Sequence, residues 1–291
     1  MPGSKMFPCR ASIAKQKYDN NATRTSIKDR MDRPLVTLTT DFGTQDSYVA
    51  QMKGAMLRRA PSLNILDLSH EIPPQDVGHA ARFISEACPK FPAGTIHVVV
   101  VDPGVGTHRS ILLAELDHQK FVCPDNGLLT DLLSSNSSPF YRRLNADEKY
   151  GRPSQTFHGR DLMGPAAADW ARGIPVEEYS EPIQRIQLLH RPEPECVGRS
   201  CRGQVIGEDS FGNLITNVNV THLPSGLSCR PTVRLEGRSE NLRWVTTYGE
   251  APEGCLVALL GSSGRVEIAQ VNGNAGRQLK IKPNNEVTVE W

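Results

Sequence analysis

Several features that define whole classes of protein are missing from this sequence of 291 residues. Its seven cysteines are scattered without a CxxC pair, which disfavours both a disulfide framework and a zinc ribbon. Neither charge is in excess, because 33 Lys and Arg residues face 32 Asp and Glu residues. A net charge of +1 gives no basic surface for nucleic acid or for an anionic membrane. We therefore expect a small molecule as the partner.

Long hydrophobic runs are also absent. The longest apolar stretch covers residues 255–260, whereas a helix that spans a bilayer needs roughly 20 apolar residues. We expect a soluble protein. Cys196 and Cys201 could form half of a metal site, but no second pair completes it. The expectation is reduced thiols, no bound metal and a cytoplasmic location.

Residues 1–33 differ from the rest in charge. They hold eight Lys or Arg and three Asp, about +5 in total, which leaves about −4 on the remaining 258 residues. The segment lacks the apolar core of a signal peptide and a convincing amphipathic repeat of a transit peptide. We predict a disordered tail, with Met31 as an alternative start of translation.

From residue 34 the pattern alternates between strands and helices. Apolar runs predict strands, and apolar spacing of three and four residues predicts helices. The expected strands are 35–39, 63–68, 96–101, 111–113 and 120–123, and the expected helices include 49–56, 77–84 and 163–170. This order predicts an α/β N-terminal domain, residues 34–190, with a mostly parallel sheet covered by helices.

A polar, proline-bearing stretch at 191–198 has the composition of a linker. Beyond it, strands are short and glycines are frequent. The expected strands are 204–206, 214–217, 232–235, 256–260, 266–269 and 287–290. We predict that residues 199–291 form a smaller all-β C-terminal domain, either a sandwich or a barrel. The length also fits two domains.

Polar residues follow the first predicted strand, the strand that ends at Val101 and the strand that ends at Cys123, where the sequence is Pro-Asp-Asn-Gly (124–127). Ligands of open α/β sheets bind at the carboxyl ends of the strands. Asp41 could bind the vicinal hydroxyls of a ribose, or it could cap the following helix. The sequence Asp102-Pro-Gly-Val-Gly lacks the spacing of either phosphate-binding motif. Its turn could return Arg109 to Asp102, as a catalytic pair or as a surface salt bridge.

His158 precedes a predicted helix. It is either structural or catalytic, and with Asp41 and Asp102 it could also hold a divalent metal in a phosphohydrolase, although no HxH, HD or DxD pair supports this. In the second half, Phe211 and Asn213 offer a stacking face and an amide for an adenine. The loops that carry them could equally be plain hairpin connections.

Seven strings of this sequence together resemble one family, the S-adenosylmethionine hydroxide adenosyltransferases, which are related to the bacterial fluorinase and chlorinase. They cover most of residues 34–291 and leave the tail outside. The strings are TLTTDFGTQDSYVAQMKG (37–54), DLSHEIPPQDV (67–77), VVVVDPGVGTHRS (98–110), CPDNGLLT (123–130), TFHGRDLMGPAAA (156–168), EDSFGNLITN (208–217) and GSSGRVEIAQVNGNA (261–275).

The resemblance implies hydrolysis of S-adenosyl-L-methionine to adenosine and L-methionine, by attack of water or hydroxide on the ribose C5′. It implies a catalytic set of Asp102, Arg109 and His158. The implied substrate-binding residues are Asp41 for the ribose, Asp46 and Asp209 facing the methionine, Phe211 and Asn213 for the adenine, Ser262 and Ser263 for the carboxylate, and Tyr48. It also implies no cofactor and a homotrimer, whose sites lie between the N-terminal domain of one subunit and the C-terminal domain of the next.

The implied chemistry suits these residues. A sulfonium is already a good leaving group, so the enzyme must mainly orient and partly desolvate a nucleophile. Arg109 can stabilise a hydroxide-like oxygen, while Asp102 and His158 polarise the water or take its proton. The sequence does not decide between these two residues, which could titrate as one unit.

Two other functions remain as alternatives. Halogenating relatives are expected to have a non-acidic residue at the position of Asp102 and an insertion around 113–121, whereas this chain has an acid and a short turn there. A protein that only binds S-adenosylmethionine or adenosine has no need for an acid, a cation and an imidazole around a water. Hydrolysis is thus the favoured prediction.

Overall fold

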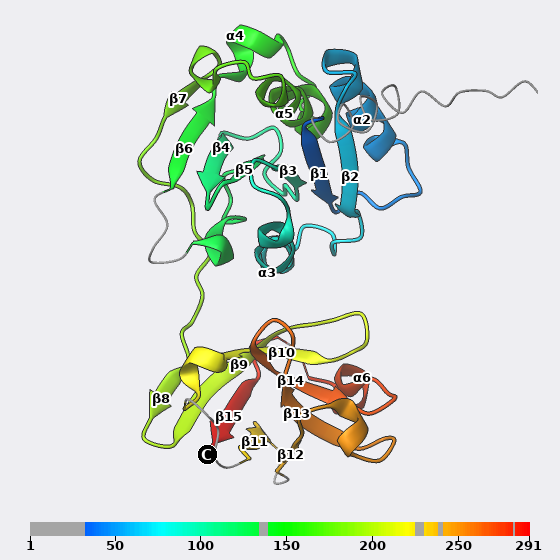
Figure 1. The fold of residues 1–291 in the computed structure, drawn as a ribbon, viewed down its shortest axis with the longest axis vertical. Helices are drawn as coiled ribbons and strands as arrows, with labels where there is room; N and C mark the ends of the chain where they lie inside the picture. Colours follow the sequence, from blue (N-terminus) through cyan, green and yellow to red (C-terminus); the bar gives the residue numbers. More distant parts are fainter. Residues whose placement is uncertain (1–32, 134–138, 225–229, 238–240, 282) are drawn as a thin grey trace, which may run out of the picture.

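The computed structural model describes residues 33–133, 139–224, 230–237, 241–281 and 283–291. The predictions of a disordered tail and of a start at Met31 therefore fall outside the described residues. Two sheets dominate the described part of the chain, each with a core of its own (Figure 1). No helix within these ranges is long and apolar enough to cross a membrane.

The first sheet has seven strands in the order β2-β1-β3-β5-β4-β6-β7. Their bounds are β1 (Leu35–Thr40), β2 (Asn64–Ser69), β3 (Ile96–Val100), β4 (Ile111–Leu116), β5 (Gln119–Pro124), β6 (Phe140–Leu144) and β7 (Ser180–Pro182). The pairs among β2, β1, β3 and β5 are parallel. The pairs of β4 with β5 and β6, and of β6 with β7, are antiparallel.

The prediction of a mostly parallel sheet holds only in part, because the sheet is mixed, with three parallel and three antiparallel strand pairs among the described residues. The change of direction occurs where β4 turns directly into β5 through Asp117 and His118, which have φ values of 46° and 66°. Two central residues with positive φ form the tight turn typical of a β-hairpin, which can only join antiparallel strands. The short turn predicted at this position is confirmed.

Helices cover both faces of this sheet, as predicted. They are α2 (Tyr48–Arg59), α3 (Val77–Ala87), α4 (Ala146–Tyr150) and α5 (Gly164–Ala171), with a π-helical turn η3 (Gly159–Met163) that runs into α5. Met56 and Ala166 pack with Val98 in one core, while Ile84 packs with Val99 in another. The side chains of neighbouring residues of β3 thus point to opposite faces of the sheet, as expected for a β-strand.

The second sheet contains β8 (Glu195–Val197), β9 (Ser200–Glu208), β10 (Leu214–Asn219), β11 (Thr232–Leu235), β12 (Arg243–Trp244), β13 (Leu256–Leu260), β14 (Arg265–Gln270) and β15 (Glu286–Glu290), with α6 (Ala275–Leu279) between the last two strands. The order is β11-β15-β9-β10-β14-β13-β12, with β8 on β9. A bridge between Val233 and Leu242 brings the two edges together. The sheet is thus nearly closed and barrel-like. Short 3-10 helices are η1 (Cys88–Lys90), η2 (Thr130–Leu132), η4 (Val176–Glu178), η5 (Val220–His222) and η6 (Tyr248–Glu250).

The expectation of reduced thiols was wrong for one pair. Cys196 of β8 and Cys201 of β9 form a disulfide, because the hairpin places them directly opposite each other with 4.0 Å between their Cα atoms. Cys88, Cys123 and Cys255 are free. Strand β8 lies inside the stretch that the composition predicts as a linker. The limits of the two domains stay predictions.

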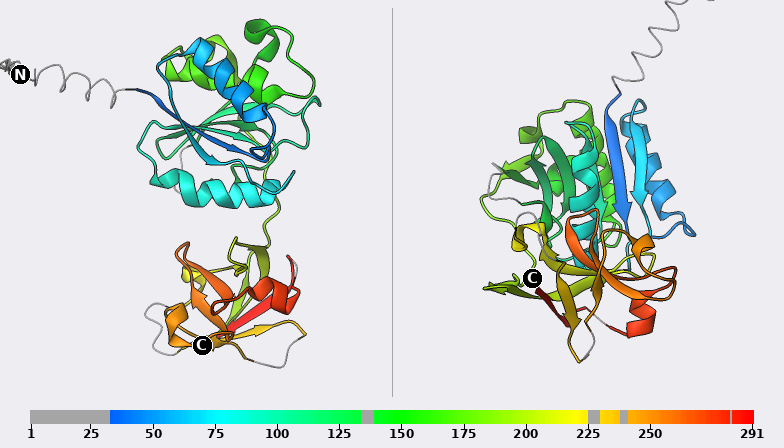
Figure 2. Two further views of the ribbon diagram at one scale, coloured as in Figure 1. Left: turned by 90° about the vertical axis from the view of Figure 1, so that its right-hand side faces the viewer. Right: turned by 60° about the horizontal axis from the view of Figure 1, so that its bottom comes forward.

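Among the helices that cover the first sheet, α3 lies nearest the second sheet (Figures 1 and 2). Arg82 of this helix donates a hydrogen bond from Nη1 to the carbonyl oxygen of Ile206 at 3.1 Å. The connecting segment is bonded on both sides: Arg191 donates to Asp131, and Asn217 donates to the carbonyl oxygen of Pro192. These polar contacts fix the connection between the two sheets.

Candidate active site

The structure brings Asp102, Arg109 and His158 together. Arg109 donates from Nε to Asp102 Oδ2 at 2.9 Å and from Nη2 to the same oxygen at 2.5 Å. The same Nη2 lies 2.7 Å from Nδ1 of His158. The side chains of Arg109 and Asp102 are only 10% and 5% exposed. The alternative of an exposed surface salt bridge is therefore wrong.

The direction of the Arg109–His158 hydrogen bond defines the state of the imidazole. A guanidinium can only donate, so His158 Nδ1 accepts, and a neutral ring carries its proton on Nε2. Burial and then the charge of Arg109 lower the pKa of His158 below its ordinary value. His158 is consequently neutral at pH 7.

Glycines allow the 102–109 loop to reach His158. Gly106 has a φ of 76°, and a Cβ atom there would overlap the carbonyl oxygen of Gln155. This close approach presses the loop against the segment that leads into His158. A Cβ on Gly104 would also crowd Cγ of Arg109 at 3.2 Å. The glycines thus let Asp102 and Arg109 come close to His158. They do not form a phosphate-binding loop.

His158 immediately precedes the π-helical turn η3. Such turns are rare and occur often at functional sites. Gly159, the first residue of η3, is packed so tightly that a Cβ atom would lie 3.3 Å from Val100 and 3.4 Å from Met52. The buried end of β3 and helix α2 thereby fix the backbone position of Gly159 and hence of its neighbour His158.

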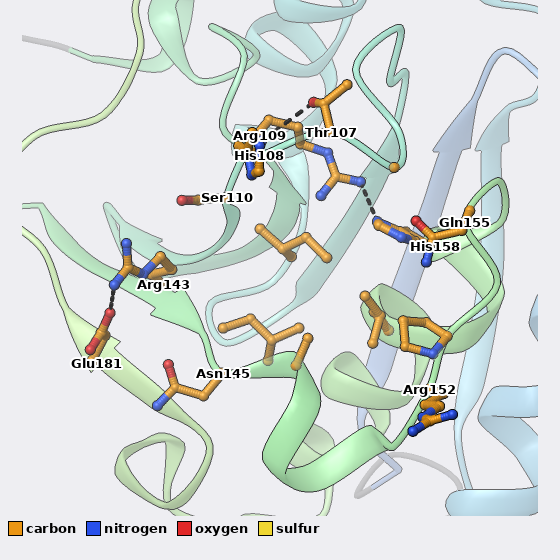
Figure 3. Close-up of a pocket in the computed structure, with 16 residues that line it drawn as sticks. Thr107, His108, Arg109, Ser110, Arg143, Asn145, Arg152, Gln155, His158 and Glu181 are labelled. Atoms are coloured by element: carbon orange, nitrogen blue, oxygen red, sulfur yellow. Dashed lines mark hydrogen bonds and ion pairs between the residues drawn. The ribbon is translucent and has the colours of Figure 1, made fainter.

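An open cavity of about 850 Å³ lies beside Arg109 and His158 (Figure 3). Arg109 and His158 meet at one side of it, and the ion pair between Arg143 and Glu181 lies at another. Arg152 comes from the loop that precedes His158. None of the predicted adenine- or methionine-binding residues lines this cavity.

Asp41 lies on the segment between β1 and α2, and Tyr48 is the first residue of α2. Asp41 Oδ2 accepts a hydrogen bond from the backbone N–H of Gln75 at 2.8 Å. It does not cap α2, whose N-cap is Ser47, so the capping interpretation was wrong. The ring of Tyr48 is 5.4 Å from that of Phe157, the neighbour of His158. Asp46 is exposed in the same segment.

In the second sheet, Asp209 organises the loop that carries the predicted adenine-binding residues. Its Oδ1 accepts from the backbone N–H groups of Phe211 at 2.9 Å and Asn213 at 2.8 Å, and its Oδ2 accepts from Asn213 Nδ2 at 2.9 Å. Asn213 is buried, whereas Phe211 is 76% exposed. The loop is therefore held by three hydrogen bonds to Asp209 and presents an aromatic ring to the outside.

Ser262 and Ser263 occupy the exposed turn between β13 and β14. Gly264 closes this turn with a φ of 77° and a hydrogen bond to the carbonyl oxygen of Gly261. Among the hydrogen bonds and ion pairs of the described ranges, none connects this turn or the Phe211 loop with Asp102, Arg109 or His158. One chain therefore carries two separate groups of predicted site residues.

The metal-site alternative finds no support in the geometry. Asp102 is held by Arg109, and the described residues contain no group of three or more His, Cys, Asp or Glu that could hold a metal ion. The absence of a cofactor stays a prediction.

The sequence places Asn126 in a polar cluster at a strand end but does not predict its role. Its Nδ2 donates to the carbonyl oxygen of Val101 at 2.9 Å, while the N–H of Asp125 donates to the carbonyl oxygen of Ser110 at 2.9 Å. The turn after β5 thereby holds both ends of the 102–109 loop. Asn126 Oδ1 is buried without a hydrogen-bond partner. The polar Pro-Asp-Asn-Gly string was the available signal, but it does not reveal which atoms the amide contacts.

Comparison with known proteins decides the family. Residues 36–180 match the SAM hydroxide adenosyltransferase N-terminal domain, and residues 203–288 match the C-terminal domain of the same name. The chain belongs to the SAM hydroxide adenosyltransferase family. The resemblance seen in the sequence is thus confirmed across both parts of the chain.

The relatives of this chain differ in the activity they are named for. An (R)-S-adenosyl-L-methionine hydrolase of Thermus thermophilus is 38% identical, over 86% of this chain and 96% of the relative. One of Salinispora arenicola is 33% identical, over 88% and 97%. A fluorinase of Nocardia brasiliensis is 27% identical, over 89% and 97%.

Solved structures of similar proteins share the fold. An uncharacterized conserved protein from Thermotoga maritima has a TM-score of 0.80 and 30% identity, covering 88% of this chain and 100% of that one. A conserved hypothetical protein from Thermus thermophilus has a TM-score of 0.70 and 35% identity, covering 88% and 99%.

Proposed function

We propose that this chain hydrolyses S-adenosyl-L-methionine to adenosine and L-methionine. The observation that carries the proposal is the buried contact of Asp102 and His158 with the same guanidinium nitrogen of Arg109. Relatives named as (R)-S-adenosyl-L-methionine hydrolases, 32–38% identical over most of the chain, support it.

In the proposed reaction, a water oxygen attacks the ribose C5′ in line with the sulfonium. The C5′–S bond breaks, its electron pair stays on sulfur, and methionine leaves as a neutral thioether. The oxygen gains negative character if its proton departs early, and Arg109 stabilises that charge. Holding the water in line supplies most of the remaining acceleration.

The hydrogen-bond directions favour Asp102 as the acceptor of the water proton. His158 Nδ1 already accepts from Arg109, and Nε2 of the neutral ring carries a hydrogen. The imidazole therefore has no free lone pair for the water proton while this contact persists. Asp102 keeps carboxylate lone pairs beyond those that face Arg109, so it takes the proton and passes it to solvent after turnover.

Halide transfer is the second candidate, because fluorinases are among the relatives. Two observations count against it. The Asp102 carboxylate is 5% exposed and would repel a halide at the position where it can hold a water. The turn at Asp117 and His118 also leaves no insertion between β4 and β5. A chain that only binds its ligand is the third candidate, and the buried catalytic set argues for turnover.

We also place the complete site between subunits of a homotrimer. Phe211 is 76% exposed and Tyr48 is 47% exposed, although both are assigned to substrate. Exposed aromatic residues on two separate surfaces of one chain fit a site that a neighbouring subunit completes. In this arrangement, Asp41 binds the ribose, Asn213 binds the adenine edge, and the Ser262–Ser263 turn binds the methionine carboxylate.

The proposed compartment is the cytoplasm, with no metal or cofactor required. The disulfide between Cys196 and Cys201 is the observation against a reducing compartment. Alkylation of cell extracts with a thiol reagent, followed by mass spectrometry, tests the location: a free pair supports the cytoplasm, and an oxidised pair overturns it. Activity that survives excess chelator supports the absence of a metal requirement.

The decisive experiment incubates the purified full chain with S-adenosyl-L-methionine and follows adenosine by chromatography. Release of adenosine and methionine in equal amounts is expected. No adenosine at high enzyme concentration would overturn hydrolysis, and a 5′-halo-adenosine formed with added chloride or fluoride would support the halogenase.

A mixing experiment tests the shared site. At low substrate concentration, Asp102→Ala chains are expected to be nearly inactive and Phe211→Ala chains to keep about a tenth of the wild-type rate. Dissociating and reassembling them together restores activity only if one chain supplies Asp102 and another supplies Phe211 to one site. Light scattering of the wild type must give three chains per particle, and any other number overturns the trimer.

A further inference from the structure

Glu267 is a buried carboxylate that the family resemblance does not assign to the substrate. It lies on β14, and the residue is only 8% exposed. Its carboxylate rests directly on Gly261, where a Cβ atom would overlap both the carboxyl carbon and Oε1. Gly261 immediately precedes Ser262, so Glu267 lies beneath the serine turn.

No cation of the described residues compensates this carboxylate with an ion pair. Its hydrogen-bond partner is the neutral Tyr248, whose hydroxyl lies 3.4 Å from Oε2. Burial and then the negative charge of Asp209 raise the pKa of Glu267 above its ordinary value. A buried carboxylate is normally paired with a cation, because moving an unpaired negative charge from water into the protein interior costs free energy.

Asp209, the neighbouring acid, is in a different situation. Both of its oxygens accept hydrogen bonds within the Phe211–Asn213 loop. These hydrogen bonds hold Asp209 in its own loop, where the resemblance implies that it faces the methionine. Glu267 has only one long hydrogen bond, so it retains the capacity to accept from an incoming cation.

We propose that Glu267 binds the α-ammonium group of the methionine portion of the substrate. The inference rests on the proposed function and adds a residue to its binding site. An α-amino acid carries its ammonium one carbon away from its carboxylate. If the Ser262–Ser263 turn holds the carboxylate, the acid beneath that turn is placed to hold the ammonium. The pair of charges is recognised together, and Tyr248 orients the Glu267 carboxylate.

Two substrates separate this role from support of the fold. S-adenosyl-L-methionine carries the amino-acid group, whereas the dimethylsulfonium derivative of 5′-deoxyadenosine keeps the adenosine and the sulfonium without it. Both release adenosine on hydrolysis. The variants are Glu267→Gln, which removes the charge at nearly constant shape, and Glu267→Asp, which keeps it.

The Glu267→Gln change is expected to raise KM for S-adenosyl-L-methionine about ten-fold or more, as for loss of a charged hydrogen bond, and to leave KM for the truncated sulfonium unchanged. Glu267→Asp should recover part of the loss. Glu290→Gln is the matched control on the same sheet, because Glu290 is exposed and paired with Arg234. It should change neither KM.

If Glu267→Gln raises KM equally for both substrates, or for neither, the role of Glu267 is overturned. If the wild type releases no adenosine, the proposed hydrolysis fails by itself. The same comparison is then made by calorimetric titration of the two sulfonium compounds. A selective loss of affinity for S-adenosyl-L-methionine still supports Glu267, and an equal affinity in wild type and variant overturns it.

Discussion

The two groups of site residues are built in opposite ways. In the first, Asp102, Arg109 and His158 are buried and bonded to one another. In the second, Phe211 is 76% exposed, and the Ser262–Ser263 turn faces outward from the sheet. Charge stabilisation needs a preorganised, desolvated environment. We call the predicted catalytic residues the chemical half of the site and the predicted substrate-binding residues of the second sheet the recognition half. The side chains of the first meet within one chain, whereas those of the second lie on loops that face outward.

The largest expected effect is on the chemical half. Asp102→Ala and His158→Ala should each lower kcat by about 100-fold to 10,000-fold, the range for loss of a group that moves or holds a proton. Affinity for S-adenosyl-L-methionine, measured by calorimetry, should change little. His118→Asn, in the exposed β4–β5 turn, is the control. Equal losses in affinity would show that these side chains hold substrate, which would remove the contrast between the two halves.

A smaller effect is expected on the recognition half. Phe211→Ala should raise KM about ten-fold with kcat nearly unchanged, because stacking of a base on an aromatic ring contributes about 1–3 kcal/mol. Steady-state kinetics of adenosine release measure both constants. The control is Val220→Ala, since Val220 is also an exposed apolar residue of the second unit. A fall in kcat at constant KM would contradict the assignment of this loop to recognition.

Asn126 acts on the chemical half indirectly, because it holds the backbone next to Asp102 without contacting the Asp102 or Arg109 side chains in the hydrogen bonds of the described residues. Asn126→Ala removes the bond to Val101 and should lower kcat about five-fold, the effect of roughly 1 kcal/mol. Asn126→Asp should lower kcat at least as much, since it also removes the donor and turns a carboxylate oxygen toward the Val101 carbonyl oxygen. Asn64→Ala, at an exposed position, is the control. A purely structural role would lower the melting temperature and leave kcat of the remaining folded enzyme unchanged.

The smallest effect concerns pH. The pKa of His158 is lowered by burial and by Arg109, while the charges of Asp102 and Asp161 oppose this. The ring should protonate only below about pH 6.5, the ordinary value, and kcat should fall there, because protonation breaks the bond with Arg109. Asp161→Asn removes one opposing charge, so the midpoint should move further down. Proton NMR of the His158 ring measures this titration midpoint. A midpoint that rises in Asp161→Asn would contradict the proposed balance of charges.

Much of the fold could be predicted because its elements have clear periods. The apolar spacing of α3 and the buried run of β3 need no tertiary information. Strand β6 was missed because its sequence, Phe-Tyr-Arg-Arg-Leu, places arginines where a strand pattern needs apolar residues. The buried Arg142 is satisfied by partners distant in sequence, since it donates to the hydroxyl and the carbonyl oxygen of Ser180, 38 residues away, and lies 3.7 Å from Glu177. Such a strand is decided by tertiary partners.

The site shows the same limit. The meeting of Asp102 with Arg109 was foreseeable, since both lie on one glycine-rich loop. The direction of the Arg109–His158 hydrogen bond, the amide of Asn126 and the buried Glu267 could not be predicted. Each depends on the packing of segments that are distant in sequence, and no local pattern records which atom of a side chain meets which neighbour.

The π-helical turn at Gly159–Met163 also makes the position of His158 depend on residue count. A π turn holds one residue more than an α turn. Successive residues of a helix are about 100° apart around its axis. Deleting a single residue from 159–163 would turn this segment into ordinary α-helix while α5 keeps its packing. Because an α turn completes the same rotation with one residue fewer, the imidazole would keep its direction toward Arg109, whereas deleting a residue from the α-helical segment 164–171 would turn it by about 100°.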